Sequence, residues 1–266
     1  MDGVLSQEEI NALLNNNDAA DSSDEILTES EKDAIGEIAN ISMGTAATTL
    51  FSLVNRRVEI STPVVSFSNW DKIVDEYEKP CVFIKIGYTQ GLNGSNILVL
   101  KEKDVKIITD LMMGGDGTNI NGEIGELHLS AISEAMNQMM GSSATSLSSM
   151  LNRTIDISPP IAEVVDLKNT LNEGEIDSFL SEEFVKISFH MEIGDLVDSE
   201  IMQLYPPAFV KEMCKGVSQN MELDTQSVTE DVPQSSNTAT QAAPIQQPQD
   251  SGSMNNASAN SQGMIN

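Results

Sequence analysis

One pattern of polar residues occurs twice in this chain. An Asp or Ser is followed four residues later by a Glu, and the Glu three residues later by an Asn. The pattern occurs at Asp33, Glu37 and Asn40, and again 97 residues later at Ser130, Glu134 and Asn137. On a helix these spacings place the three side chains on one face. A carboxamide both donates and accepts hydrogen bonds and can orient a water molecule, while a carboxylate can pair with a basic group of a partner.

The duplication extends beyond these polar residues. A glycine follows each Asn by four residues, at Gly44 and Gly141, and a proline follows later, at Pro63 and Pro160. A single Glu-x-x-Asn on an exposed helix is most simply a set of solvated polar residues. Repetition at a fixed offset indicates two copies of one structural unit and favours a function, with the glycine leaving room for close approach of another protein. The proline is interpreted as structural, at the start or edge of a strand.

Composition narrows the class of partner. The 266 residues include 14 basic and 41 acidic side chains, for a net charge of −27. This argues against nucleic-acid binding and against anionic membranes, and favours a partner with a basic group. The chain opens with no basic stretch and no long apolar run, so neither a signal peptide nor membrane insertion is expected, and the cytoplasm is the predicted compartment.

Hydrophobic periodicity predicts the same order of elements in both halves. The first half has a helix over 28–55, β-rich stretches at 58–67, 81–88 and 96–100, and a helix over 104–113. The second has a helix over 123–151, β-rich stretches at 154–165, 184–191 and 199–204, and a helix after 206–207. We therefore expect an α+β fold in which two helix-strand-strand-strand-helix repeats, about 28–114 and 123–217, share one sheet around a pseudo-twofold axis.

The ends of the chain differ from this domain. Residues 1–16 include a short amphipathic helix over 4–14, and residues 17–27 are interpreted as a flexible linker. Residues 218–266 lack Lys, Arg and aromatic residues, which predicts a disordered tail or a linker.

Other motifs favour structural roles. His128 and His190 are single residues on apolar stretches, and the glycine-rich segment 114–117 lacks the Lys-Ser/Thr of a phosphate loop and is predicted to be a turn. Cys81 and Cys214 form no CxxC motif, so neither a disulfide framework nor a zinc site is indicated. Five methionines at helical spacing are interpreted as core rather than as a binding groove: Met112, Met113, Met136, Met139 and Met140.

The duplicated pattern resembles that of the CheC/FliY/CheX phosphatases of bacterial chemotaxis: Asp or Ser, three residues, Glu, two residues, Asn, twenty-two residues, Pro. Both copies fit it without a gap, and the resemblance covers about residues 26–217. The N-terminal segment is similar to the peptide with which the switch proteins FliM and FliY capture phosphorylated CheY, which points to the FliY branch rather than the CheC branch. The residues that carry this similarity include Leu5, Ser6, Gln7, Ile10, Leu13 and Leu14.

The resemblance implies hydrolysis of the aspartyl phosphate of a CheY-like response regulator. Asn40 and Asn137 would orient the attacking water, and the two glutamates of the pattern would pair with the regulator's lysine. Asp33 and Ser130 would support the helix start or the rim of the contact. The regulator would bring its own Mg²⁺, so no metal or other cofactor is expected on this chain.

The alternative is a non-enzymatic component of the flagellar switch, or an adaptor, that only binds the phosphorylated regulator. Further partners implied by the resemblance are flagellar switch proteins and CheD, and the implied location is the cytoplasmic face of the flagellar basal body. Proteins of the FliY branch carry a FliN-like domain after a Gln/Ser-rich linker, and this chain stops within a segment of that composition. It is either a shortened form or a fragment of a longer protein.

Overall fold

The computed structural model describes residues 26–77, 80–167, 174 and 176–227. The predicted peptide 1–16, most of the linker after it and most of the C-terminal tail lie outside these residues. The first half comprises α2 (Glu29–Val54), β1 (Val58–Ile60), β2 (Val64–Ser68), α3 (Trp70–Glu76), β3 (Cys81–Gln90), β4 (Gly94–Lys101) and α4 (Glu102–Met112). The second comprises α5 (Glu126–Leu151), β5 (Asp156–Ile157), β6 (Ile161–Val165), the 3₁₀ turn η2 (Ser178–Ser181), β7 (Phe184–Ile193), β8 (Val197–Tyr205) and α6 (Pro207–Ser227).

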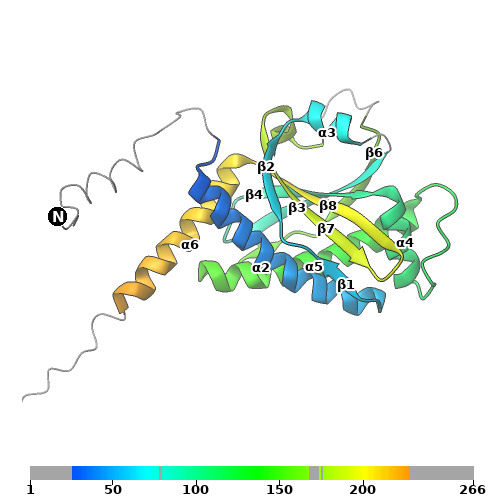
Figure 1. The fold of residues 1–266 in the computed structure, drawn as a ribbon, viewed down its shortest axis with the longest axis horizontal. Coiled ribbons are helices and arrows are strands. Elements are labelled where there is room, and N and C mark those ends of the chain that lie inside the picture. Colours follow the sequence, from blue (N-terminus) through cyan, green and yellow to red (C-terminus); the bar gives the residue numbers. More distant parts are fainter. Residues whose placement is uncertain (1–25, 78–79, 168–173, 175, 228–266) are drawn as a thin grey trace, which may run out of the picture.

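The two halves share one sheet, as predicted, and the structure shows that its strands are antiparallel. Its strand order is β1-β7-β8-β4-β3-β5, with β2 also paired to β7 and β6 also paired to β3. The first strands of each half therefore pair with the long hairpin of the other half. Helices α2 and α5 lie against one face of this sheet, and α3 lies on the opposite side (Figure 1). Each half depends on the other for its sheet partners, so the repeats form one structural unit.

Prolines and serines of the repeat divide the first predicted β-stretch of each half into two strands. Ser61 Oγ accepts a hydrogen bond of 3.0 Å from His190 N–H, and Ser158 Oγ accepts one of 3.2 Å from Gly87 N–H. These equivalent contacts tie the segment between the two strands to the hairpin of the opposite half. Pro160 is buried and Pro63 is half-buried at the corresponding turn, in keeping with the structural role predicted for them.

The ends of the long helices follow from local sequence. Thr28 and Glu31 form a capping box at the start of α2. At the other ends Asn55 and Asn152, identical in the repeat, adopt the left-handed conformation with φ of 49° and 47°. Asparagine tolerates this conformation better than most residues, which explains why both copies use it to end the helix. Helix α6 continues to Ser227, ten residues into the predicted tail, because no glycine or proline in that stretch ends it.

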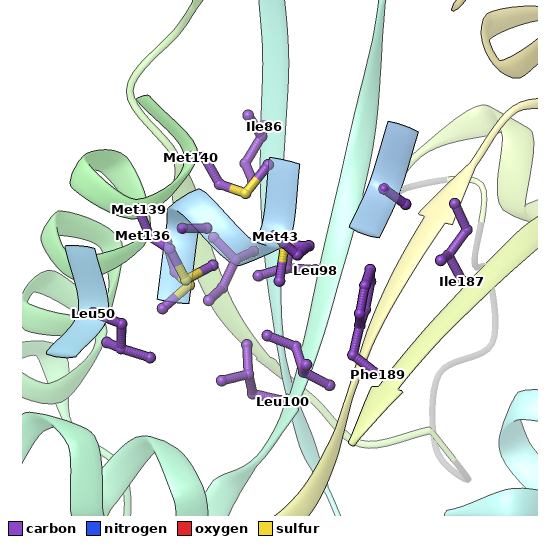
Figure 2. Packing of buried hydrophobic residues seen from close by; sticks show 14 of the residues in the cluster. Met43, Leu50, Ile86, Leu98, Leu100, Met136, Met139, Met140, Ile187 and Phe189 are labelled. Atoms are coloured by element: carbon purple, nitrogen blue, oxygen red, sulfur yellow. The ribbon is translucent and has the colours of Figure 1, made fainter. Parts of the chain in front are cut away.

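The main core lies between the sheet and the pair α2 and α5, and it includes several methionines. Met43 and Met140 point toward the strands, with Met136 and Met139 beside them (Figure 2). The prediction of core methionines is confirmed for Met136, Met139 and Met140 and is wrong for Met113, which is 51% exposed. Met113 follows the last residue of α4, where the chain turns into solvent.

A smaller apolar cluster fills the opposite face of the sheet beneath α3 and η2. Trp70 of α3 packs edge-on against Phe83, and Phe179 of η2 packs in the same way against Phe184. Neither α3 nor η2 was predicted, because each is too short to show helical periodicity. Over the described parts of the chain, no helix has the length and apolar character needed to cross a membrane.

Candidate functional site

Helices α2 and α5 pack side by side and carry both copies of the polar pattern (Figure 1). Thr45 Oγ1 lies 2.8 Å from Ser146 Oγ, and Thr49 Oγ1 donates to Ser142 Oγ at 2.9 Å. From the first bond to the second, the residue number rises on α2 and falls on α5, so the helices run antiparallel. The repeat offset of 97 converts the first pair into the second. The pseudo-twofold axis therefore passes between these two hydrogen bonds, in line with the predicted symmetry.

In the first copy the polar pattern lies on the outer surface. Asp33, Glu37 and Asn40 are all exposed. One turn later, Gly44 is exposed too, and a Cβ built there would meet nothing within 4 Å. Asp33, Glu37, Asn40 and Gly44 thus form an exposed polar strip outside the core. Because the glycine has no side chain, a partner's surface can reach the helix backbone there.

The second copy is arranged in the same way on α5. Ser130 and Glu134 are exposed and Asn137 is half-buried. Gly141 follows one turn later, again with nothing within 4 Å of a Cβ built on it. Here the glutamate has a neighbour on its own helix, because Gln138 Nε2 donates a hydrogen bond of 2.7 Å to Glu134 Oε1.

The two copies form separate sites. The pseudo-twofold axis passes at the level of Ala47 and Ala144, midway between the two hydrogen bonds. Asn40 precedes Ala47 by seven residues, and Asn137 precedes Ala144 by seven. With the helices antiparallel and a rise of 1.5 Å per residue, the two asparagines are about 20 Å apart along the helix pair. Each pattern therefore has room for its own partner molecule, and neither completes the other.

The two copies differ at several positions, and at two of them an exposed residue of the first copy is apolar where the second copy has a polar one. Beside Glu37 the helix carries Ile41, where the second copy has Gln138. Further along it carries Phe51, where the second copy has Ser148. Comparing the repeats for differences on the exposed face, rather than for identities, would have found both.

The remaining candidates have structural explanations. His128 Nδ1 accepts a hydrogen bond of 3.3 Å from Gly125 N–H at the start of α5. Burial raises the pKa of the Cys81 thiol to about 11 and that of Cys214 to about 11, so neither is a thiolate nucleophile near neutral pH. Gly117 N–H donates to Asp110 Oδ2 at 2.8 Å, which makes segment 114–117 the predicted turn. In the described part of the chain, no group of three or more His, Cys, Asp or Glu side chains is placed to hold a metal ion.

Comparison with known proteins relates both copies to one family. The model of the CheC-like family matches residues 31–67 and 127–164, which run from each long helix past the repeat proline. The flagellar motor switch phosphatase FliY of Bacillus subtilis is 47% identical over 218 residues, covering 80% of this chain and 57% of the relative. The chain thus spans little more than half the length of that relative. The CheY-P phosphatase CheC of the same organism is 24% identical over 143 residues, covering 52% of this chain and 67% of the relative.

Solved structures agree with this assignment. The FliM middle domain of H. pylori has the same fold at 12% identity, with a TM-score of 0.56 over 71% of this chain and 99% of that one. The crystal structure of Thermotoga maritima FliY is 42% identical, with a TM-score of 0.67, and the match covers 73% of this chain and 99% of that one. Similarity at this level over a whole solved domain, with both polar patterns on exposed helices, shows that the chain belongs to the CheC-like family.

Proposed function

We propose that this chain is a protein aspartyl-phosphate phosphatase that acts on a phosphorylated CheY-like response regulator. The observation that carries the proposal is the pair of Glu-x-x-Asn patterns on the outer faces of α2 and α5, each followed by an open glycine. Two relatives, FliY and CheC of Bacillus subtilis, are named as phosphatases, and the name of CheC specifies CheY-P.

The chemistry requires little covalent work from this protein. The oxygen of a water molecule forms a bond to phosphorus while the bond between phosphorus and the regulator's aspartate oxygen breaks. The electron pair of that bond stays on the aspartate carboxylate, and the water gives up a proton to phosphate or solvent. Asn40 and Asn137 orient the water through their carboxamides, and positioning of this kind supplies about 100-fold, or about 2.7 kcal/mol.

The glutamates fix the regulator over the asparagine. Glu37 and Glu134 lie one turn before Asn40 and Asn137 on the same helix face, so a lysine paired with the carboxylate places the phosphorylated aspartate beside the carboxamide. Asp33 and Ser130 support the rim of the contact. The Mg²⁺ that neutralises the phosphate comes with the regulator, and the chain itself supplies no cofactor.

The proposal includes a place of action. The chain works in the cytoplasm, at the cytoplasmic face of the flagellar basal body, with flagellar switch proteins and CheD as further partners. The name of the FliY relative, a flagellar motor switch phosphatase, supports this location. Peptide 1–16, outside the described residues, captures the regulator and delivers it to the two sites.

The decisive experiment measures phosphate release from the phosphorylated regulator. The double substitution N40A/N137A should abolish the stimulated hydrolysis while the circular dichroism spectrum stays unchanged, since neither side chain belongs to the core. Each single substitution should retain part of the activity. The matched control is S52A/S149A, a pair of exposed serines related by the same offset, which should hydrolyse normally.

Normal hydrolysis by N40A/N137A would disprove the water-positioning role. Binding of the phosphorylated regulator by the unsubstituted chain, with no acceleration of phosphate release, would instead support the non-enzymatic switch or adaptor.

A further inference from the structure

The surface next to the first site carries an exposed aromatic residue that the second site lacks. Phe51 is 47% exposed on the outer face of α2, while the second copy has Ser148 at the equivalent position. Along the helix Phe51 lies on the same flank as Asn40 and Gly44, at 100° per residue. The apolar side chain therefore belongs to the surface that continues from the first site.

A groove follows this flank between α2 and β1. It has a volume of about 490 Å³ and begins one turn after Asn40. Val58 and Ile60 of β1, which line it, are half-buried, and β1 is at an edge of the sheet. The residues that line the groove are Gly44, Ala47, Thr48, Phe51, Val58, Glu59 and Ile60.

In the second copy a small polar side chain, Ser148, stands at the place of Phe51 and hydrogen-bonds to the backbone on both sides of it. Ser148 Oγ donates to Ala144 O at 2.8 Å and accepts from Ile155 N–H at 2.9 Å. This serine ties the start of the following strand to the helix, and Ile155 is only 4% exposed. The second copy does expose an apolar residue, Leu127, but it precedes Ser130 and so lies at the opposite end of the strip from Gly141.

We propose that the groove beside Phe51 is a docking groove for the phosphorylated regulator that serves the first site alone, so that the first site binds the regulator more tightly than the second. This inference rests on the proposed function, and the occupant is an apolar side chain of the same regulator. A partner that brings its phosphorylated aspartate to Asn40 covers Gly44, and the groove begins at that glycine. An exposed phenylalanine that becomes buried at the centre of a contact is a typical source of binding energy.

The test separates the sites and then removes the aromatic ring. In N137A, which retains only the first site, F51S should raise the KM for the phosphorylated regulator about tenfold and leave kcat unchanged, as expected for loss of a contact made equally in the ground and transition states. In N40A, which retains only the second site, the groove adjoins no active site. Adding F51S to N40A should therefore leave the KM unchanged. The matched control is M113Q, because Met113 is similarly exposed at 51% but lies outside α2 and the groove.

A binding measurement keeps the inference independent of hydrolysis. The full chain is titrated calorimetrically with regulator whose aspartate carries beryllofluoride as a stable phosphate mimic. Besides binding by peptide 1–16, we expect two classes of site on the helices, the tighter of which is weakened about tenfold by F51S and not by M113Q. If N40A/N137A hydrolysed normally, the proposed catalytic role would fail, yet this titration would still decide whether the groove binds the regulator.

Three results would overturn the inference. One is unchanged binding and an unchanged KM after F51S. Another is an equal change in the N40A and N137A backgrounds, which would indicate a general structural effect of Phe51. The third is tighter binding of the regulator after F51S, with no such gain from F51S once residues 1–16 are deleted. That result would show that the groove holds a segment of this chain instead of the regulator.

Discussion

Gln138 Nε2 donates a hydrogen bond of 2.7 Å to Glu134 Oε1, whereas Ile41 occupies the equivalent position beside Glu37. The glutamate of the second site is therefore held in one orientation by a neighbour one turn along the helix. Among the described residues, no hydrogen bond of this kind orients Glu37. The repeat thus preserves the Glu and Asn of the two sites but not their local support.

This difference predicts a small kinetic effect of Gln138. In the N40A background, Q138M keeps the side-chain length but removes the amide, so Glu134 must be ordered on binding. Because a pair of this type on a helix surface contributes about 0.2–0.5 kcal/mol, kcat/KM for the phosphorylated regulator should fall about twofold. Steady-state phosphate release measures the change, with S149A as the exposed control on α5. An unchanged kcat/KM would show that the hydrogen bond plays no part in docking.

Met43 and Met113 provide a matched test of the core. Met43 is 0% exposed and its sulfur accepts a hydrogen bond of 3.4 Å from Gln203 Nε2, while Met113 is 51% exposed. M43A leaves a cavity between α2 and the sheet and should lower the free energy of unfolding by about 2–5 kcal/mol. M113A should change it by less than about 0.5 kcal/mol. Urea unfolding followed by circular dichroism gives both values, and equal effects would contradict the placement of Met43 in the core.

Asp104 predicts a pH dependence of stability. The side chain is 4% exposed, and burial raises the pKa of its carboxyl above the usual value of 3.8 despite the nearby Lys101 and Lys103. The folded state therefore keeps a proton that the unfolded chain has lost, so this group lowers the free energy of unfolding as pH rises above 3.8. D104N removes the ionisation and should be more stable than the original chain at pH 7.

The same comparison at lower pH provides the control. Below the usual carboxyl pKa, Asp104 is mostly protonated in both states, and the advantage of D104N should shrink. Urea unfolding of the two proteins at pH 7 and at about pH 3.5 measures the difference. An advantage that persists unchanged at low pH would rule out ionisation of Asp104 as its cause.

Deletion of residues 1–16, which lie outside the described part of the chain, tests the capture peptide. An amphipathic segment of this length binds with an affinity on the order of micromolar, and tethering raises the local concentration of the regulator. The deletion should therefore slow hydrolysis at low regulator concentration and leave the saturated rate nearly intact. The measurement is a titration of phosphorylated regulator against both proteins. A lower maximal rate with an unchanged half-saturation point would implicate the peptide in the catalytic step.

Much of the architecture could be predicted from the sequence, because local signals agree with the fold. Apolar periodicity predicted both long helices, and the same periodicity placed Glu37 and Asn40 on the outer face. The identity of Asn55 and Asn152 reflects one local need, an end to the helix in the left-handed conformation. These features depend on neighbouring residues along one helix, which a sequence displays directly.

The sharing of one sheet by the two halves was predicted, but the pairing of its strands could not be predicted in the same manner. Strand β3 begins at Cys81 and its counterpart β7 begins at Phe184, so the offset between them is 103 and no longer the 97 of the helices. Pairing of β1 with β7 and of β5 with β3 joins segments more than 60 residues apart, and no periodicity encodes such partners.

The difference between the two sites likewise depends on contacts between distant elements. Phe51 and Ser148 stand at equivalent places in the repeat, and neither belongs to the motif. Whether a groove opens beside them depends on where the next strand lies, and in the second copy Ser148 accepts a hydrogen bond from Ile155 N–H just before that strand. The chemical groups that each site presents could be predicted because they follow one another along a single helix. The surface around each site could not, because it is formed by packing between elements that are far apart in the chain.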